Sequence, residues 1–170
     1  MTPTTPYSAA LGDREPIAAM RASADRYRQL LGGWAPAQFE RTYAPGKWTA
    51  RQILIHLAQA ELALGNRARM ALSTPHYAAQ SFDQDRWMSI ESGGSSGSGR
   101  SGGLSGAAAL DVFLALVMMN RTFFEALSPA DRATTLSHPE YGKLTVDWIL
   151  HQLAGHQIHH LHQLEQIATG

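Results

Sequence analysis

Apolar residues recur at helical spacing in four separate stretches of the chain. They return at intervals of three and four residues, which is the pattern of an amphipathic helix with one buried face. Gly32 and Gly33 follow the first stretch, and Ser73-Thr74-Pro75 follows the second, as helix-ending signals do. The pattern therefore predicts four long helices, over about 13–31, 49–72, 107–127 and 145–168.

The second and fourth predicted helices begin with capping signals. Thr49 can cap the second helix while the Gln52 side chain reaches back, which makes a capping box. Both helices follow the same short pattern of glycine, lysine, an apolar residue and threonine, at Gly46–Thr49 and at Gly142–Thr145. This faint internal echo indicates two helix pairs of similar construction.

The predicted fold is all-α. Two helix pairs joined by a long connection make a four-helix bundle with one crossover, here between the second and third helices. No stretch of the sequence alternates convincingly enough to predict a strand. We read residues 138–142 as a turn or an extended connector before the last helix.

Residues 13–170 are expected to form a single domain, since 170 residues suffice for one buried core. Residues 1–12, rich in Thr, Pro and Ser, are expected to be a flexible tail. Residues 92–103 hold only Ser, Gly and Arg100, a composition that behaves as a flexible loop. The sequence leaves open whether this loop is natural or engineered.

Composition excludes several kinds of function. The 14 basic and 14 acidic residues give a formal net charge of zero with no basic stripe, so we expect no nucleic-acid partner. The absence of cysteine excludes disulfides, thiolate catalysis and cysteine-based metal sites. We find no signal peptide and no apolar run of about 18 residues, so we expect a cytoplasmic protein without a membrane partner.

The eight histidines are the remaining candidates for chemistry. At about 100° per residue, His156 and His160 share the apolar face of the last helix, one turn apart. His56 lies on the apolar stripe of the second helix. The other five are read as solvated, flanking or loop residues: His76, His138, His151, His159 and His162.

A single histidine on an apolar face is more often a core residue bonded to a backbone carbonyl than a metal ligand. Three of them facing one core need an explanation, because an unpartnered buried polar group costs about 1–3 kcal/mol. Neutral imidazoles without thiolates suit zinc, nickel or another late first-row ion, and three ligands leave positions for water. The sequence contains neither the Glu-x-x-His motifs of a di-iron bundle nor the His-Glu-x-x-His motif of zinc proteases.

Four segments resemble the DinB/YfiT-like superfamily. Residues 48–61 read Trp-Thr-x-x-x-Ile-Leu-x-His-Leu-x-x-x-Glu, and residues 138–145 read His-Pro-x-x-Gly-x-Leu-Thr. Residues 156–164 read His-x-x-His-His-x-x-Gln-Leu, and the Phe-Asp-x-Asp-x-Trp piece at 82–87 is also similar to the family. The segments cover both halves of the chain in the family's order and spacing.

The resemblance implies a bundle of up-down-down-up topology, often a homodimer. It implies one divalent metal ion, usually zinc or nickel, held by one histidine of the second helix and two of the fourth. Those positions are His56, His156 and His160 here, the same three that the helical wheel selects. Characterised members include S-transferases that use bacillithiol or mycothiol and a mycothiol-dependent isomerase, and many others are called metal-dependent hydrolases.

We therefore expect an enzyme whose metal ion activates either water or a low-molecular-weight thiol for attack on a small-molecule substrate. The sequence identifies no catalytic residue beyond the ligands. Residues that could support the ligands or line a pocket mouth are Gln59, Arg67, Tyr77, Trp87, His159 and Gln163.

The alternative is a metal-binding or dimeric interaction protein without turnover. It is favoured by the lack of a core-facing carboxylate, since Glu61 points off the apolar stripe and Asp147 belongs to a first helical turn. A purely structural metal site is the third reading, but a closed site usually has a fourth protein ligand.

Overall fold

A computed structural model describes residues 2–91 and 103–170, and its four long helices match the predicted ones. The Thr49 hydroxyl accepts a hydrogen bond from the backbone N–H of Gln52, and the Gln52 side chain accepts one from the backbone N–H of Thr49, so the predicted capping box is confirmed. The first of the four long helices begins at Pro16 and not near residue 13 as expected, because the Glu15 carboxylate caps it. The helices are α2 (Pro16–Leu31), α3 (Ala50–Ser73), α5 (Gly106–Glu125) and α7 (Val146–Thr169).

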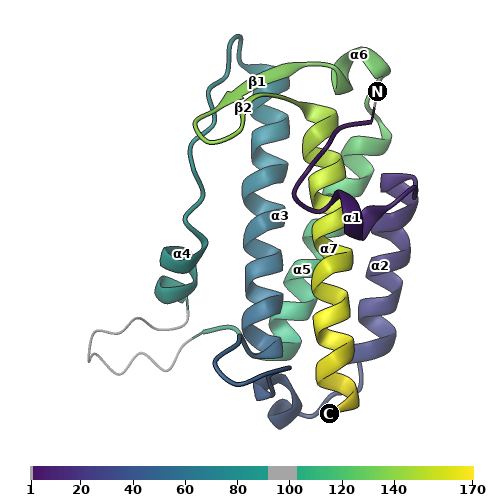
Figure 1. Cartoon of the computed structure of the whole chain (residues 1–170), viewed down its shortest axis with the longest axis vertical. Coiled ribbons are helices and arrows are strands. Elements are labelled where there is room, and N and C mark those ends of the chain that lie inside the picture. Colours follow the sequence, from purple (N-terminus) through teal and green to yellow (C-terminus); the bar gives the residue numbers. More distant parts are fainter. Residues whose placement is uncertain (1, 92–102) are drawn as a thin grey trace.

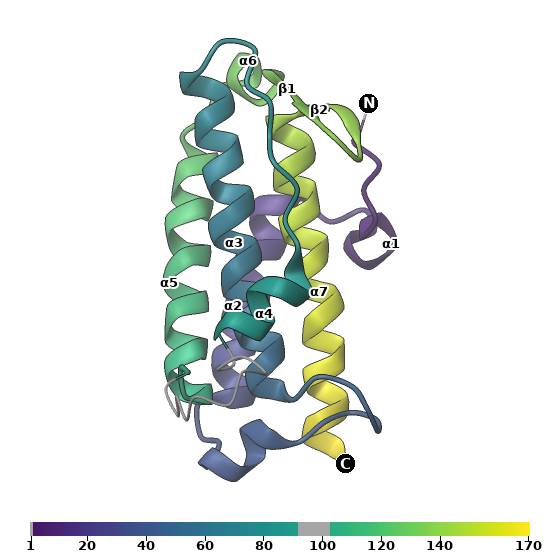
Figure 2. The ribbon, with the colours of Figure 1, turned by 90° about the vertical axis from the view of Figure 1, so that its left-hand side faces the viewer.

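The four helices form a bundle in which α2 and α7 run one way and α3 and α5 run the other (Figures 1 and 2). Each helix packs against two neighbours, in the order α2, α7, α3, α5 around the bundle. The up-down-down-up arrangement is therefore confirmed. A 3-10 helix (Pro36–Glu40) joins α2 to α3, and the crossover from α3 to α5 contains α4 (Gln84–Glu91). The expected Ser/Gly loop at 92–103 lies, except for Gly103, outside the described residues.

Helix α5 is the most apolar of the four. By length and composition alone, with a mean hydropathy of 1.5, it could cross a membrane, a property that the buried core helices of other bundles share. Here α5 packs along α3 and α2. Part of the α5 surface faces outward, at Val112, Met118 and Met119.

A short antiparallel ribbon precedes α7, so the expectation of no strand is wrong. Strands β1 (Thr135–His138) and β2 (Gly142–Thr145) pair with Leu136 opposite Leu144. Four residues are too few for an alternating pattern to be evident in the sequence, and the turn depends on Gly142, whose φ of 69° favours glycine. The α6 helix (Pro129–Arg132) leads into this ribbon, which covers one end of the bundle (Figure 1).

The N-terminal segment also differs from the flexible tail we expected. It contains helix α1 (Ser8–Leu11), which packs on α7, and the side chains of Thr5 and Leu11 are buried. The indole N–H of Trp148 donates to the carbonyl of Thr4 over 2.9 Å. Apolar and aromatic residues interrupt the polar composition of this segment, and burying them against α7 orders the chain.

A buried polar network links all four long helices. Both carboxylate oxygens of Glu61 on α3 accept hydrogen bonds, from the Asn120 amide at 2.8 Å and from the Gln157 amide at 2.6 Å. The Tyr27 hydroxyl donates to the backbone carbonyl of Gln157 over 2.8 Å. Glu61 is only 1% exposed, and burial raises its pKa to about 7 even though both hydrogen bonds lower it. The sequence reading of Glu61 as off the core was wrong, because α3 is buried on two sides, by α5 and by α7.

The raised pKa predicts that Glu61 makes stability fall as the pH rises. Above about pH 4.5 the unfolded chain releases this proton while the folded chain keeps it until about pH 7. The free energy of unfolding should therefore drop by about 3 kcal/mol between pH 5 and pH 8 through this group. In Glu61→Gln the drop should disappear, because an amide does not titrate and Gln157, whose Oε1 has no partner among the described residues, can turn to accept from it.

Urea unfolding at several pH values measures this effect as the difference between wild type and Glu61→Gln. Asp111→Asn, an exposed position on α5, is the control and should follow wild type. Parallel stability curves for wild type and Glu61→Gln would show that Glu61 is ionised with its ordinary pKa in the folded protein.

Candidate metal centre

Three imidazoles meet between α3 and α7. His56 lies in the second turn of α3, and His156 and His160 lie one turn apart on α7, with all three at most 6% exposed. Their ring centroids are 4.5, 4.9 and 5.0 Å apart, and one nitrogen from each ring lies within 4.8 Å of the other two. The structure thus brings together the three histidines that the sequence selected.

The ring nitrogens are arranged for a shared partner. The Nε2 atoms of His56 and His156 are 2.9 Å apart, so one must carry a proton that the other accepts. His160 Nδ1 is 2.7 Å from the amide oxygen of Gln163, and donation to that oxygen leaves a lone pair on His160 Nε2. That Nε2 is buried and has no partner among the described residues.

This donor set fits a late first-row divalent ion. Two imidazole nitrogens on one tetrahedral zinc ion lie roughly 3.3 Å apart, given Zn–N bonds of about 2.0–2.1 Å. The 2.9 Å pair would need to open by less than about half an ångström. The orphaned His160 Nε2 would gain the partner that it lacks, and the Gln163 bond to the opposite ring nitrogen is the arrangement that orients metal-binding histidines.

Burial keeps the three imidazoles neutral. It is the largest cause in each case, and lowers the pKa of His56 to about 4 and that of His160 to about 3. The pKa of His156 lies well below its usual value, because burial is reinforced by the neighbouring histidines. At neutral pH the site therefore offers uncharged nitrogen lone pairs, the form in which histidine binds metals.

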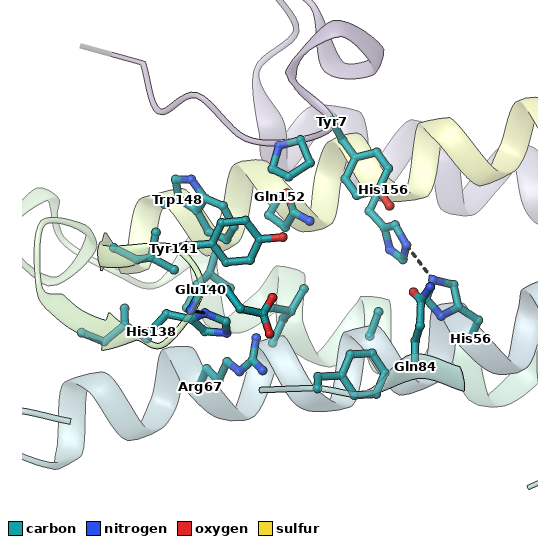
Figure 3. A pocket seen from close by; sticks show the side chains of 17 residues that line it. Tyr7, His56, Arg67, Gln84, His138, Glu140, Tyr141, Trp148, Gln152 and His156 are labelled. Carbon is teal, nitrogen blue, oxygen red and sulfur yellow. Dashed lines mark hydrogen bonds between the residues drawn. The ribbon is translucent and has the colours of Figure 1, made fainter. Parts of the chain in front are cut away.

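A cavity of about 180 Å³ opens beside the imidazoles (Figure 3). His56 and His156 form one end of it, and Arg67, His138 and Tyr141 lie toward the other end, beneath the β ribbon. Glu140 is the only acidic residue among those that line it. Its carboxylate accepts a hydrogen bond from Ser81, so it is held away from the imidazoles.

Of the residues expected to support the ligands or line a pocket mouth, some contact the histidines or line the cavity and others do neither. Gln163 contacts His160 directly and is 3.3 Å from His159, while Arg67 lines the cavity and donates to the carbonyl of Gln80. Gln59 is buried and does not line the cavity. Its side-chain amide has no hydrogen-bond partner among the described residues. The residues expected at a pocket mouth, Tyr77 and Trp87, do not line the cavity either.

The sequence did not predict two of the residues that line the cavity, His138 and Tyr7. His138, which we read as a surface residue, is 6% exposed because β1 carries it inward. Its Nδ1 accepts from the backbone N–H of Glu140, so Nε2 carries the proton. Tyr7, which fell in the expected tail, packs against His156 with its ring tilted by 52° and the ring centroids 4.9 Å apart. Burial raises the pKa of Tyr7, so its phenol stays protonated.

The fold is that of a known family of bundle proteins. The family profile of the DinB superfamily matches residues 19–164, most of the chain. The chain belongs to the DinB superfamily, and the resemblance seen in the sequence is confirmed.

Several proteins that are similar to this chain carry the name "Putative metal-dependent hydrolase". One from Oceanobacillus iheyensis is 26% identical over 124 residues, which are 73% of this chain and 67% of that protein. One from Geobacillus thermodenitrificans is 31% identical over 74 residues, 44% of this chain and 42% of the relative. The first match thus spans about two thirds of the relative's own length, and the second spans less than half.

Two solved structures share the fold. YfiT from Bacillus subtilis, described as a probable metal-dependent hydrolase with an unusual four-helix bundle topology, superposes with a TM-score of 0.75 at 19% identity. That match covers 91% of this chain and 84% of YfiT. A mycothiol-dependent maleylpyruvate isomerase gives a TM-score of 0.68 at 16% identity, and covers 95% of this chain and 63% of the isomerase.

Proposed function

We propose that the chain is a cytoplasmic metal-dependent enzyme of the transferase or hydrolase type. His56, His156 and His160 hold one divalent ion, zinc or nickel, and the adjoining cavity holds a small-molecule substrate. A bound ion of this kind lowers the pKa of a coordinated water or thiol and so supplies a nucleophile at neutral pH. The observation that carries the proposal is the convergence of three buried, neutral imidazoles beside a cavity, two of which have a nitrogen without a partner among the described residues.

The residues around the ligands hold them in place. Gln163 fixes the ring of His160 through its Nδ1. The Trp48 ring packs on His56 and the Tyr7 ring on His156, each with centroids 4.9 Å apart. These aromatic walls exclude water from the sides of the cluster and leave the cavity as the approach for a substrate.

The cavity favours a thiol over water as the nucleophile. A water-activating site commonly uses a carboxylate base beside the reacting atom, as general-base catalysis requires a group within hydrogen-bond reach. Glu140 is the only cavity carboxylate, and it lies at the end away from the imidazoles. A low-molecular-weight thiol has a lower pKa than water and depends less on such a base. The reaction we favour is therefore the attack of a thiol sulfur on an electrophilic substrate.

The predicted effect of His156→Ala is the loss of both metal and turnover. Protein prepared without affinity resin or chelator and then supplied with zinc or nickel should bind about one ion per chain, by elemental mass spectrometry after desalting. His156→Ala removes one of three ligands and should retain little or none. Loaded wild type should consume thiols in the presence of electrophiles in a panel of bacillithiol, mycothiol, glutathione and coenzyme A, and the variant should not.

The matched control is His162→Ala, which changes an exposed histidine on the same helix and should keep both metal and turnover. Equal metal content in wild type and His156→Ala would overturn the site. Bound metal with no turnover of thiols or of activated esters would instead favour a metal-binding or interaction protein without catalysis.

A homodimer is part of the same proposal, with the outward face of α5 as its surface. Val112, Met118 and Met119 are 39%, 57% and 48% exposed there, an apolar face that a second copy of the chain could cover. Light scattering after size exclusion should give twice the chain mass of 18.5 kDa for wild type. The double substitution Met118→Glu and Met119→Glu should give the monomer mass, and a wild-type monomer would contradict the dimer.

A further inference from the structure

Gly155 stands in the middle of α7, directly before His156, where a glycine is unfavourable. Glycine in a helix interior is destabilising relative to alanine, so its presence here needs a reason. A Cβ at this position would lie 2.6 Å from the carbonyl oxygen of Tyr7 and 2.8 Å from its Cβ. Gly155 therefore allows the N-terminal segment to lie directly against α7 beside the imidazole cluster.

The N-terminal segment is fixed on both sides of Tyr7. Before it, the carbonyl of Thr4 accepts from the indole of Trp148, and the Thr5 side chain is buried. After it, α1 continues to Leu11, which is 3% exposed against the core. The backbone of Tyr7 is thus held from both directions, and its side chain has a defined place.

The Tyr7 side chain forms part of the cavity wall at the end where His56 and His156 lie. The Tyr7 ring lies 4.9 Å from the His156 ring and 5.2 Å from the His159 ring, measured between centroids. Tyr7 lines the cavity, and its hydroxyl points inward beside His156 (Figure 3). The hydroxyl makes no hydrogen bond to any residue that the structure describes, although a half-buried phenol ordinarily finds one.

We propose that Tyr7 is a ligand-positioning residue, whose hydroxyl donates a hydrogen bond to the oxygen or sulfur atom of a small molecule bound at the three imidazoles. Gly155 is the position that permits this by letting the Tyr7 backbone approach α7. The proposal rests on the proposed metal site and adds a donor that comes from outside the four long helices. A purely packing role would need only the ring, so the hydroxyl separates the two roles.

The test is thiolate binding to the cobalt-loaded full chain. Cobalt(II) reports its ligands through visible absorption, and 2-mercaptoethanol is the probe titrated. Tyr7→Phe keeps the ring and removes the donor, so the apparent dissociation constant for the probe should rise about tenfold, as expected for one lost hydrogen bond to a charged acceptor. Cobalt affinity and the thermal midpoint should stay at their wild-type values.

Tyr77→Phe is the matched control, since Tyr77 lies outside the cavity lining, and it should bind the probe as wild type does. Gly155→Ala should weaken probe binding by a similar factor because it displaces Tyr7. Adding Tyr7→Phe to Gly155→Ala should then cause little further loss, since both changes remove the same contact.

The outcomes separate the two proposals. Wild type that binds no cobalt would overturn the metal site and this inference together. Cobalt-loaded wild type and Tyr7→Phe with equal affinity for the probe would overturn the role of Tyr7 alone. An equal loss in Tyr77→Phe would also overturn it, because the effect would not be specific to the cavity hydroxyl.

Discussion

The burial of three imidazoles at one point in a bundle core is the constraint on which the site depends. Removing these rings from water costs free energy unless their nitrogens find partners, and it holds them neutral. His56 and His156 share one proton, and His160 keeps one nitrogen without a partner among the described residues. A divalent ion at this point would give one nitrogen of each of the three rings a partner at once.

The topology explains why such a cluster can form and still be reached. Helices α3 and α7 are neighbours in the bundle, so one histidine from α3 meets a pair spaced one turn apart on α7. The segments that connect the helices enclose the cavity. The β ribbon before α7, the crossover after α3 and the N-terminal segment surround one side of this helix pair and enclose the cavity (Figures 1 and 3). The long helices position the ligands, and the connecting segments shape the space beside them.

The sequence predicted the features that depend on local periodicity. Its predictions were wrong or missing where tertiary contacts determine whether a residue is buried. The helix starts at Thr49 and Thr145 and the inward phase of the histidines follow from spacing and capping. Glu61 was misjudged because a single apolar stripe does not describe a helix packed on two sides. His138 and Tyr7 were missed because a four-residue strand and a short N-terminal turn carry too little pattern. The glycine at 155 was the available signal, since a glycine inside a long helix marks a close approach.

The central claim is that one divalent ion sits among His56, His156 and His160, and anomalous diffraction from crystals of zinc-loaded protein tests it most directly. Data collected on both sides of the zinc absorption edge locate the ion without reference to any assumed site. We expect one strong peak per chain, about 2.0–2.1 Å from one nitrogen of each of the three rings. A fully loaded crystal whose peak lies elsewhere, or touches fewer than three of these rings, would contradict it.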